Sequence, residues 1–273
     1  MAGNLNHYLK IGFQAINALM FPPVCVFCGI EHVGFDSYIC KTCNEDISPV
    51  EGPICECCGL PVAGTMNSQN QLCGNCSKKT PLIDKTRFSV FYSRVIRRGI
   101  LKFKFSNSLF LGEALSGFLV KSFEESYSDA SLDAIVPIPV HDDRLIKRGY
   151  NQSAILAKKL GKKVGVNVLT NCLAKSRNTT PQTQLKRKER LANIKGSFFV
   201  RNPLVIKNQR LLILDDVFTT GSTVSEAARV LKSHGAHSVN ALVLGLRYGN
   251  IEKDSKTDLK AYREIFFIGG KSR

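Results

Sequence analysis

Two adjacent carboxylates, followed by a run of hydroxyl side chains, are the residues of this chain best suited to chemistry. Asp215 and Asp216 come directly after the apolar run 211–214, which we expect to be a buried strand. Residues 219–223, with the sequence TTGST, form a short loop, and a helix is expected from Val224. In an open α/β sheet, ligands bind at this kind of strand-to-helix junction.

These residue types suit the two ends of a ribose phosphate. Hydroxyl donors and the unpaired N–H groups at a helix start bind a phosphate. Ionised carboxylates only accept hydrogen bonds, so they suit sugar hydroxyls or a metal ion instead. A Ser or Thr helix cap is the alternative, but it accounts for one hydroxyl and not for four beside two carboxylates. We find no GxxxxGKS or GxxxxGKT motif and no GxGxxG after a strand, so other nucleotide signatures are missing.

Basic residues in two further segments are suited to a second anionic group. The segment 141–152, HDDRLIKRGYNQ, follows an expected strand; it is either an anion-binding loop or the solvated start of a basic helix. The segment 175–193 is polar, then basic, which fits a mobile lid in its first half and a charged surface helix in its second.

Nine of the ten cysteines lie between Cys25 and Cys76, mostly as CxxC pairs, which is a strong zinc-ribbon pattern. The simplest arrangement is two four-thiolate zinc sites, formed by Cys25, Cys28, Cys40 and Cys43 and by Cys55, Cys58, Cys73 and Cys76. An interleaved pairing stays open, Cys57 is left over, and His32 is a weaker alternative ligand. We see no signal peptide before this segment, so disulfides are disfavoured and a reduced, cytoplasmic protein is expected.

Composition indicates the kind of partner. The 273 residues carry 38 Lys and Arg against 22 Asp and Glu, a net charge of +16. That balance favours nucleic acid, a phosphorylated metabolite or an acidic membrane, without choosing among them. No apolar run approaches the roughly 18 residues of a membrane span.

The elements that must position these residues alternate between strands and helices. We expect strands at 88–92, 134–139, 164–169, 198–200, 211–214 and 239–246, and helices at 109–122, from 154 and from 224. This alternation predicts an α/β fold with a doubly wound, mostly parallel sheet. We expect a small helix and double zinc-ribbon module over 1–79 and the sheet domain over 80–273.

The segment 211–223 resembles the ribose-phosphate loop of type I phosphoribosyltransferases, which bind phosphoribosyl pyrophosphate (PRPP) with Mg²⁺. The resemblance implies that Asp215 and Asp216 bind the ribose and Mg²⁺. It assigns the 5′-phosphate to Val217, Phe218, Thr219, Thr220, Gly221, Ser222 and Thr223. Candidate pyrophosphate contacts are Arg144, Lys147, Arg148, Arg177, Lys186, Arg187 and Arg190. No general base and no acceptor-binding hood is recognisable in the sequence.

The order of motifs along nearly the whole chain (CxxC pairs, VPxP, RxxxRGYNQ, TPQTQL, DDVFTTGST) is similar to that of the bacterial ComF family. The resemblance implies a phosphoribosyltransferase-like protein involved in DNA uptake during natural transformation, with other competence proteins such as a helicase as partners. Whether it is an active pentosyl transferase stays open. One alternative is a non-catalytic accessory that binds single-stranded DNA through its basic surface and uses PRPP as a ligand or signal. Tyr92, Phe103, Phe105 and Tyr150 are then the candidate stacking residues.

Overall fold

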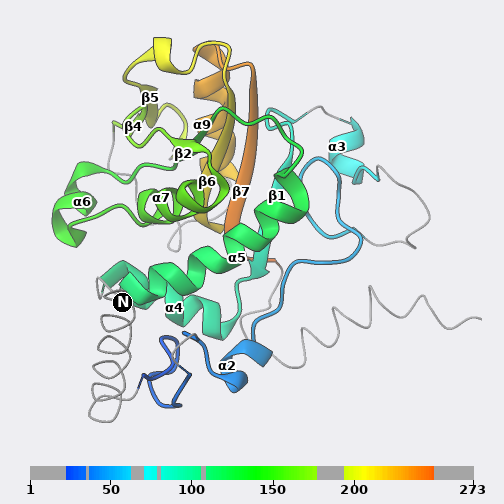
Figure 1. Ribbon diagram of the computed structural model, residues 1–273. Coiled ribbons are helices and arrows are strands. Elements are labelled where there is room, and N and C mark those ends of the chain that lie inside the picture. Colours follow the sequence, from blue (N-terminus) through cyan, green and yellow to red (C-terminus); the bar gives the residue numbers. More distant parts are fainter. Residues whose placement is uncertain are drawn as a thin grey trace, which may run out of the picture.

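The computed structural model describes residues 23–34, 37–62, 71–78, 81–105, 109–176 and 194–248 (Figure 1). Its main sheet has five parallel strands in the order β1-β7-β6-β2-β3. These strands are β1 Thr86–Phe91, β2 Ala134–Pro137, β3 Asn167–Val168, β6 Arg210–Phe218 and β7 Ser238–Leu246. The central strand β6 is apolar and buried over residues 211–214, as expected for a parallel strand covered on both faces.

Helices cover both faces of this sheet, which confirms the doubly wound, mostly parallel architecture. The long helices are α4 Arg94–Phe105, α5 Leu109–Tyr127, α7 Gln152–Val164 and α9 Ser222–Ser233. Leu211 and Ile213 of β6 share a core with α9, whereas Leu212 and Leu214 share the other core with α4, α5 and α7. This alternation along β6 follows from the two-residue period of a strand.

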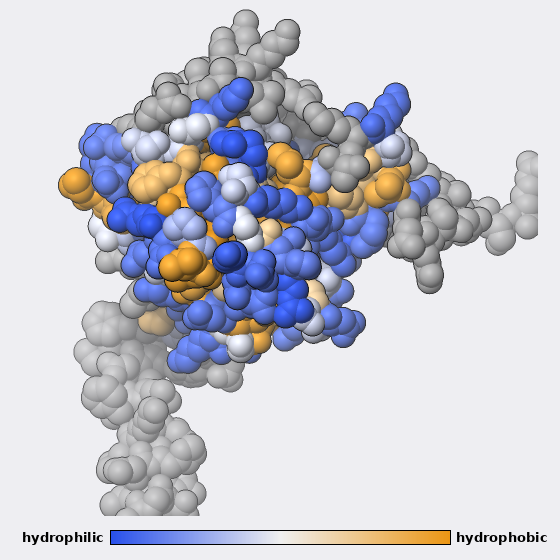
Figure 2. Space-filling model, turned by 90° about the horizontal axis from the view of Figure 1, so that it is seen from above, coloured by the Kyte–Doolittle hydropathy of each residue, from blue (hydrophilic) through white to orange (hydrophobic). Residues whose placement is uncertain are grey.

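Shorter elements complete the described structure. They are α2 Lys41–Glu45, α3 Gly74–Lys78, α6 Asp142–Arg148, the 3₁₀ helix η2 Pro203–Val205, β4 Leu173–Lys175 and β5 Phe198–Val200. Within the described ranges, none of the helices has the length and apolar character needed to cross a membrane. The face seen in Figure 2 is mostly hydrophilic, with its apolar side chains in separate patches.

Two strand predictions need correction. The strand expected at 198–200 exists, but it pairs antiparallel with β4 in a separate sheet and does not join the parallel one. The strand expected at 164–169 is reduced to two residues, because α7 continues to Val164. Gly165, at φ 71°, then ends the helix, with its N–H donating to the carbonyl of Gly161.

Two boundaries at the candidate site also differ from expectation. Strand β6 runs to Phe218, so the two carboxylates belong to the strand and not to the loop after it. Helix α9 begins at Ser222, two residues earlier than predicted. Of the two interpretations left open for the segment after β2, the structure has the helix, α6, with His141 as its N-cap and Gly149, at φ 77°, as its C-cap. Away from the site, the helix expected at 109–122 continues to Tyr127.

The first cysteine-rich segment packs on helix α4. Cys25 and Phe27 lie in the same core as Ile96, Ile100 and Phe103 of that helix. In Figure 1 the segment with α2 lies below α4, next to the sheet domain. The two parts of the chain therefore share a hydrophobic core.

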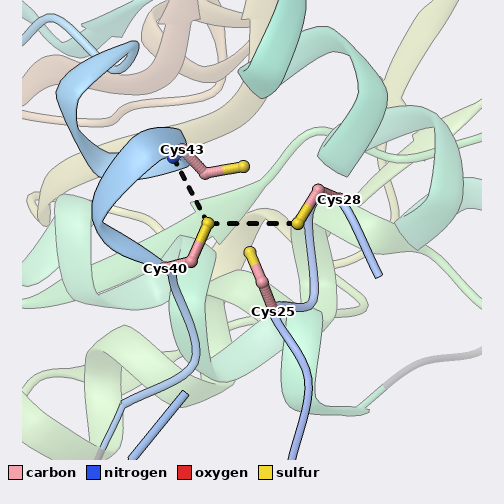
Figure 3. A group of neighbouring side chains, drawn as sticks. All are labelled: Cys25, Cys28, Cys40 and Cys43. Carbon is pink, nitrogen blue, oxygen red and sulfur yellow. Dashed lines mark hydrogen bonds between the residues drawn. The ribbon is translucent and has the colours of Figure 1, made fainter. Parts of the chain in front are cut away.

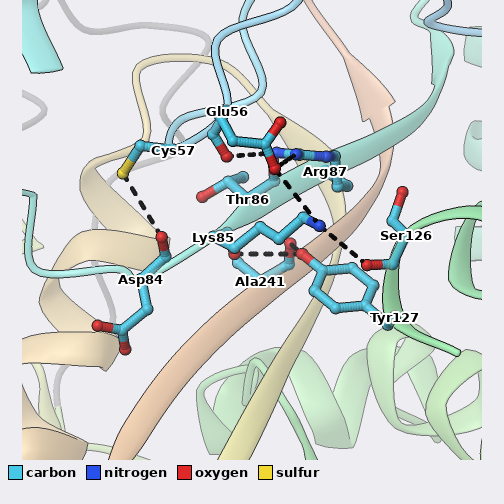
Figure 4. A network of polar contacts seen from close by, with 9 residues as sticks. All are labelled: Glu56, Cys57, Asp84, Lys85, Thr86, Arg87, Ser126, Tyr127 and Ala241. Carbon is cyan, nitrogen blue, oxygen red and sulfur yellow. Dashed lines mark hydrogen bonds and ion pairs between the residues drawn. The ribbon is translucent and has the colours of Figure 1, made fainter. Parts of the chain in front are cut away.

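The second cysteine-rich segment is bonded to the start of β1 (Figure 4). The Arg87 guanidinium donates to the carbonyl of Glu56, at 2.8 Å, and to its carboxylate, at 2.5 Å. The backbone N–H of Thr86 donates to the carbonyl of Cys57, at 2.7 Å. Nearby, the buried Tyr127 hydroxyl lies 2.9 Å from the carbonyl of Ala241, which ties α5 to β7.

Candidate functional site

The two adjacent carboxylates lie at the carboxyl end of β6, where a doubly wound sheet binds its ligands. Asp215 is only 8% exposed and accepts hydrogen bonds from the Ser153 hydroxyl, at 3.3 Å, and the Asp216 N–H, at 2.9 Å. Burial, together with the charge of Asp216, raises the pKa of Asp215 to about 7. In the ligand-free protein this carboxyl group is therefore protonated for part of the time at neutral pH.

Asp216 has a different environment from its neighbour. Its carboxylate forms an ion pair with the ammonium of Lys104, with 2.5 Å between the oxygen and nitrogen atoms. Lys104 comes from the last turn of α4, so the acidic pair is bounded on one side by this helix.

The hydroxyl-rich loop joins β6 to α9 as the sequence indicates. Gly221 is the N-cap of α9. Because glycine has no side chain, it forms no side-chain hydrogen bond to the N–H groups at the start of the helix. Helix-start N–H groups of this kind bind phosphate. The hydroxyls of Thr220 and Ser222 lie 2.9 Å apart and add further donors.

Gly221 is required at this position by its backbone and by its surroundings. Its φ is +75°, a conformation that glycine adopts without steric cost. A Cβ atom would lie 2.7 Å from the ring of Phe218. The ring of Phe218 also packs edge-on against Phe88, with centroids 4.8 Å apart, so it has little room to move.

Val217 and Phe218, which the resemblance assigns to the 5′-phosphate, are the last residues of β6. They pair with Gly245 and Leu246 of β7. Their contribution within the described structure is to hold the loop against the sheet, and phosphate contact by them stays a prediction.

Basic side chains from α6 and β4 form the other side of the site. Burial and the neighbouring Arg148 lower the pKa of Arg144. Burial, with Arg144 as a second cause, lowers the pKa of Lys175 to about 8, and the charge of Asp215 opposes this shift. A bound anion would compensate this concentration of positive charge.

The other basic candidates divide into two groups. Arg148 donates to the Gln152 side chain, at 3.2 Å, and lies over the ring of Phe105, whereas Lys147 is exposed. The remaining predicted pyrophosphate contacts lie outside the described residues: Arg177, Lys186, Arg187 and Arg190. The structure therefore brings Arg144 near Lys175, which in turn is near Asp215, and leaves those four untested.

Sequence reasoning missed three residues of this site: Lys104, Ser153 and Lys175. Ser153 directly follows the RGYNQ motif, and Lys175 is the first residue of the segment assigned to the lid, so each was next to or within a recognised signal. Lys104 belongs to a basic run whose only signal was charge, and nothing local distinguishes it from the other basic residues of that run.

Eight cysteines form two compact groups, and Figure 3 shows the first. The ligand atoms of each group all lie within 4.8 Å of one another: Cys25, Cys28, Cys40 and Cys43, then Cys55, Cys58, Cys73 and Cys76. This grouping is the simplest one predicted, and the interleaved pairing is not adopted. All ten cysteines are free of disulfides.

The spacing of the sulfur atoms fits zinc. Four thiolates in a tetrahedron around Zn²⁺, at about 2.3 Å each, lie roughly 3.8 Å from one another. The sulfur atoms of Cys28 and Cys40 lie 3.9 Å apart, and those of Cys58 and Cys73 lie 3.7 Å apart. Cys57 belongs to neither group and lies next to the backbone carbonyls of Ile83 and Asp84. The two groups fit two structural zinc ions.

Sheet order, the acidic end of β6 and the glycine-capped start of α9 together define a phosphoribosyl transferase domain. Residues 124–269, more than half of the chain, match the phosphoribosyl transferase domain family. Residues 16–77 match the double zinc ribbon domain family.

Most of the chain also resembles three curated proteins. It is 30% identical over 223 residues to Competence protein F of Haemophilus influenzae, covering 79% of this chain and 93% of that protein. It is 29% identical to DNA utilization protein YhgH of Escherichia coli K12, covering 83% and 98%, and 26% identical to Competence protein ComFC of Bacillus subtilis, covering 77% and 84%. The chain belongs to the ComF family.

Proposed function

We propose that this protein binds PRPP together with Mg²⁺ at the carboxyl end of β6. The observation that carries the proposal is the junction of two adjacent carboxylates, a hydroxyl-rich loop and an N-cap glycine at the start of α9. In this assignment Asp215 and Asp216 accept hydrogen bonds from the ribose hydroxyls, and the start of α9 binds the 5′-phosphate.

The basic side of the site is assigned to the pyrophosphate. Burial lowers the pKa of both Arg144 and Lys175, and neighbouring positive charge lowers both further. A pyrophosphate group would neutralise this charge. Asp215 and Asp216 would hold Mg²⁺, which prefers carboxylate and phosphate oxygens and would supply positive charge to the pyrophosphate. For transfer, these groups would position PRPP and stabilise the charge that develops as pyrophosphate leaves.

Isothermal titration of the zinc-loaded protein with PRPP and Mg²⁺ tests the binding proposal. We expect saturable binding that weakens roughly 100-fold in an Asp215→Asn/Asp216→Asn variant, because each charge-assisted hydrogen bond contributes about 1.5–3 kcal/mol. The matched control is Asp129→Asn, which removes one exposed carboxylate in the turn after α5. Equal binding by the double variant and the control would contradict the assignment.

We further propose that the protein works on DNA in the cytoplasm during natural transformation. Support comes from its relatives, two of which are named as competence proteins and one as a DNA utilization protein. The excess of basic residues is consistent with a nucleic-acid partner. Deletion of the gene in a transformable host should lower the number of transformants without affecting growth on purine or pyrimidine sources.

A second proposal is that single-stranded DNA binds along α4 and α6. Phe105 is 73% exposed and lies 5.4 Å from the Arg148 guanidinium, which makes it a candidate platform for base stacking. Phe103, also a candidate from the sequence, is only 2% exposed, because it packs in the core between α4 and α5. It cannot stack on a base, so that part of the prediction was wrong.

Fluorescence titration of a labelled oligothymidylate at several salt concentrations tests this second proposal. Binding should weaken linearly with the logarithm of the salt concentration. Phe105→Ala should weaken it about tenfold, since base stacking contributes about 1–3 kcal/mol. The control is Leu204→Ala, an 80% exposed apolar residue on η2. A flat salt response, or equal loss in both variants, would contradict it.

A further inference from the structure

Lys104 occupies the acidic part of the candidate site. Its ammonium lies 2.5 Å from the Oδ2 atom of Asp216, and the two side chains are only 21% and 14% exposed. The pair is therefore shielded from solvent, unlike most surface ion pairs, which contribute little. Lys104 belongs to α4 and Asp216 to β6, so their contact depends on the position of α4 relative to the sheet.

Helix α4 is held firmly in the position that creates this contact. Phe103, the residue before Lys104, is buried in the core, and its carbonyl accepts a hydrogen bond from the Tyr150 hydroxyl. Lys102 donates to the carbonyl of Phe27 in the first zinc ribbon, at 3.1 Å. The last turn of α4 is thus fixed from two sides, and Lys104 is directed at Asp216 by the fold.

An ammonium group in this place occupies an oxygen atom of Asp216 that a ligand could also use. A carboxylate has about four acceptor positions on its two oxygen atoms, and an ammonium group that donates to one oxygen uses part of them. A divalent cation or a ribose hydroxyl that binds the Oδ2 atom of Asp216 would compete with Lys104 for these positions. Lys104 is therefore a tethered competitor for the subsite.

We propose that Lys104 is an internal counter-ion of the acidic pair, which occupies Asp216 in the ligand-free protein and is displaced when a divalent cation binds there. The proposal rests on the proposed function, since it takes the acidic pair as the cation subsite. The ammonium group of Lys104 compensates negative charge at the acidic pair when no metal ion is bound. Adjacent carboxylates at this depth would otherwise repel each other. The consequence is a lower affinity for the cation than the carboxylates alone would give.

Electron paramagnetic resonance of free Mn²⁺, titrated with the zinc-loaded protein in the absence of PRPP, tests the proposal directly. We expect the Lys104→Gln variant to bind Mn²⁺ about tenfold more tightly than the unmodified protein. Lys104→Arg, which keeps the charge, should retain the weak binding. In a Lys104→Gln/Asp216→Asn variant the gain should disappear.

The matched control is Arg94→Gln. It removes the same charge from the first turn of the same helix, about 15 Å along the axis from Lys104 at 1.5 Å per residue. A tenfold gain in this control as well would attribute the effect to net charge and overturn the proposal. Mn²⁺ binding that is unchanged or weaker in Lys104→Gln would overturn it too.

Repeating the titration with PRPP present separates this proposal from the proposed function. If Lys104→Gln gains affinity for Mn²⁺ but no variant binds PRPP, the counter-ion role holds and the PRPP assignment fails. If the unmodified protein binds Mn²⁺ and PRPP but Lys104→Gln binds them less well, Lys104 contacts the phosphates and the counter-ion role fails.

Discussion

Replacing Asp215 by Asn should make the ligand-free protein more stable at pH 8 while it weakens the candidate site. Asp215 is buried beside Asp216, and these two causes raise its pKa from 3.8 to about 7. An amide of the same shape has no charge to desolvate. Its oxygen still accepts the hydrogen bonds from the Ser153 hydroxyl and the Asp216 N–H.

The size and the pH range of the effect follow from the raised pKa. Below about pH 4 the carboxyl group is protonated in both the folded and the unfolded chain, so it costs no stability. As the pH rises from about 4 to about 7, the Asp215 carboxyl group ionises in the unfolded chain but stays protonated in the folded one, so folding stability is lost. A shift of about three pKa units corresponds to roughly 4 kcal/mol. The new amide also brings a buried N–H₂ group that needs acceptors, which costs about 1–3 kcal/mol. We therefore expect a net gain of about 2 kcal/mol in Asp215→Asn.

Thermal unfolding by differential scanning calorimetry, in buffers without added divalent cations or chelators, measures this gain. For a chain of this size we expect a melting temperature about 4–8 °C higher at pH 8, since each kcal/mol raises it by about 2–4 °C. The difference should shrink towards zero near pH 4. A variant that is less stable than the unmodified protein at pH 8, or a gain that is equal at both pH values, would refute the reasoning.

Three further predictions concern packing, the loop and the metal. Gly99→Ala should destabilise the protein by about 1–3 kcal/mol in chemical unfolding, because the new Cβ atom would lie 2.3 Å from the ring of Phe27. Gly221→Ala should lower the affinity for PRPP at least tenfold in calorimetry, because it strains a backbone at φ +75° and collides with Phe218. Chelation should release two zinc ions and lower the melting temperature of the whole chain, since the first ribbon shares its core with α4.

The packing prediction has a matched control, and each prediction has an outcome that would contradict it. Gly117→Ala, in a helical position with nothing within 4 Å of the new atom, should instead stabilise the protein by about 0.5–1 kcal/mol. If Gly99→Ala behaved like Gly117→Ala, the ribbon would not pack on α4 as described. Unchanged PRPP affinity in Gly221→Ala, or unfolding of the sheet domain that is unaffected by chelation, would contradict the other two predictions.

Features that depend on residues close together in the sequence were predicted well. The apolar runs before Asp215 and at 239–246 gave the central strands, because a strand buried on both faces needs only a continuous apolar stretch. The CxxC pairs gave both zinc groups, because each pair forms on a single turn. The acidic, hydroxyl-rich junction of β6 and α9 is likewise one continuous segment.

Features that depend on contacts between distant segments could be decided only by the tertiary structure. The sequence placed the strand at 198–200 in the parallel sheet, whereas packing pairs it with β4. Ser153 and Lys104 reach the acidic pair from α7 and α4, and their distance along the chain hides any pattern that could link them to it. Spacing along the sequence determines which groups meet within one turn or one strand. The crossing of helices over a shared core determines which side chains then meet at Asp215 and Asp216, and in which state of charge.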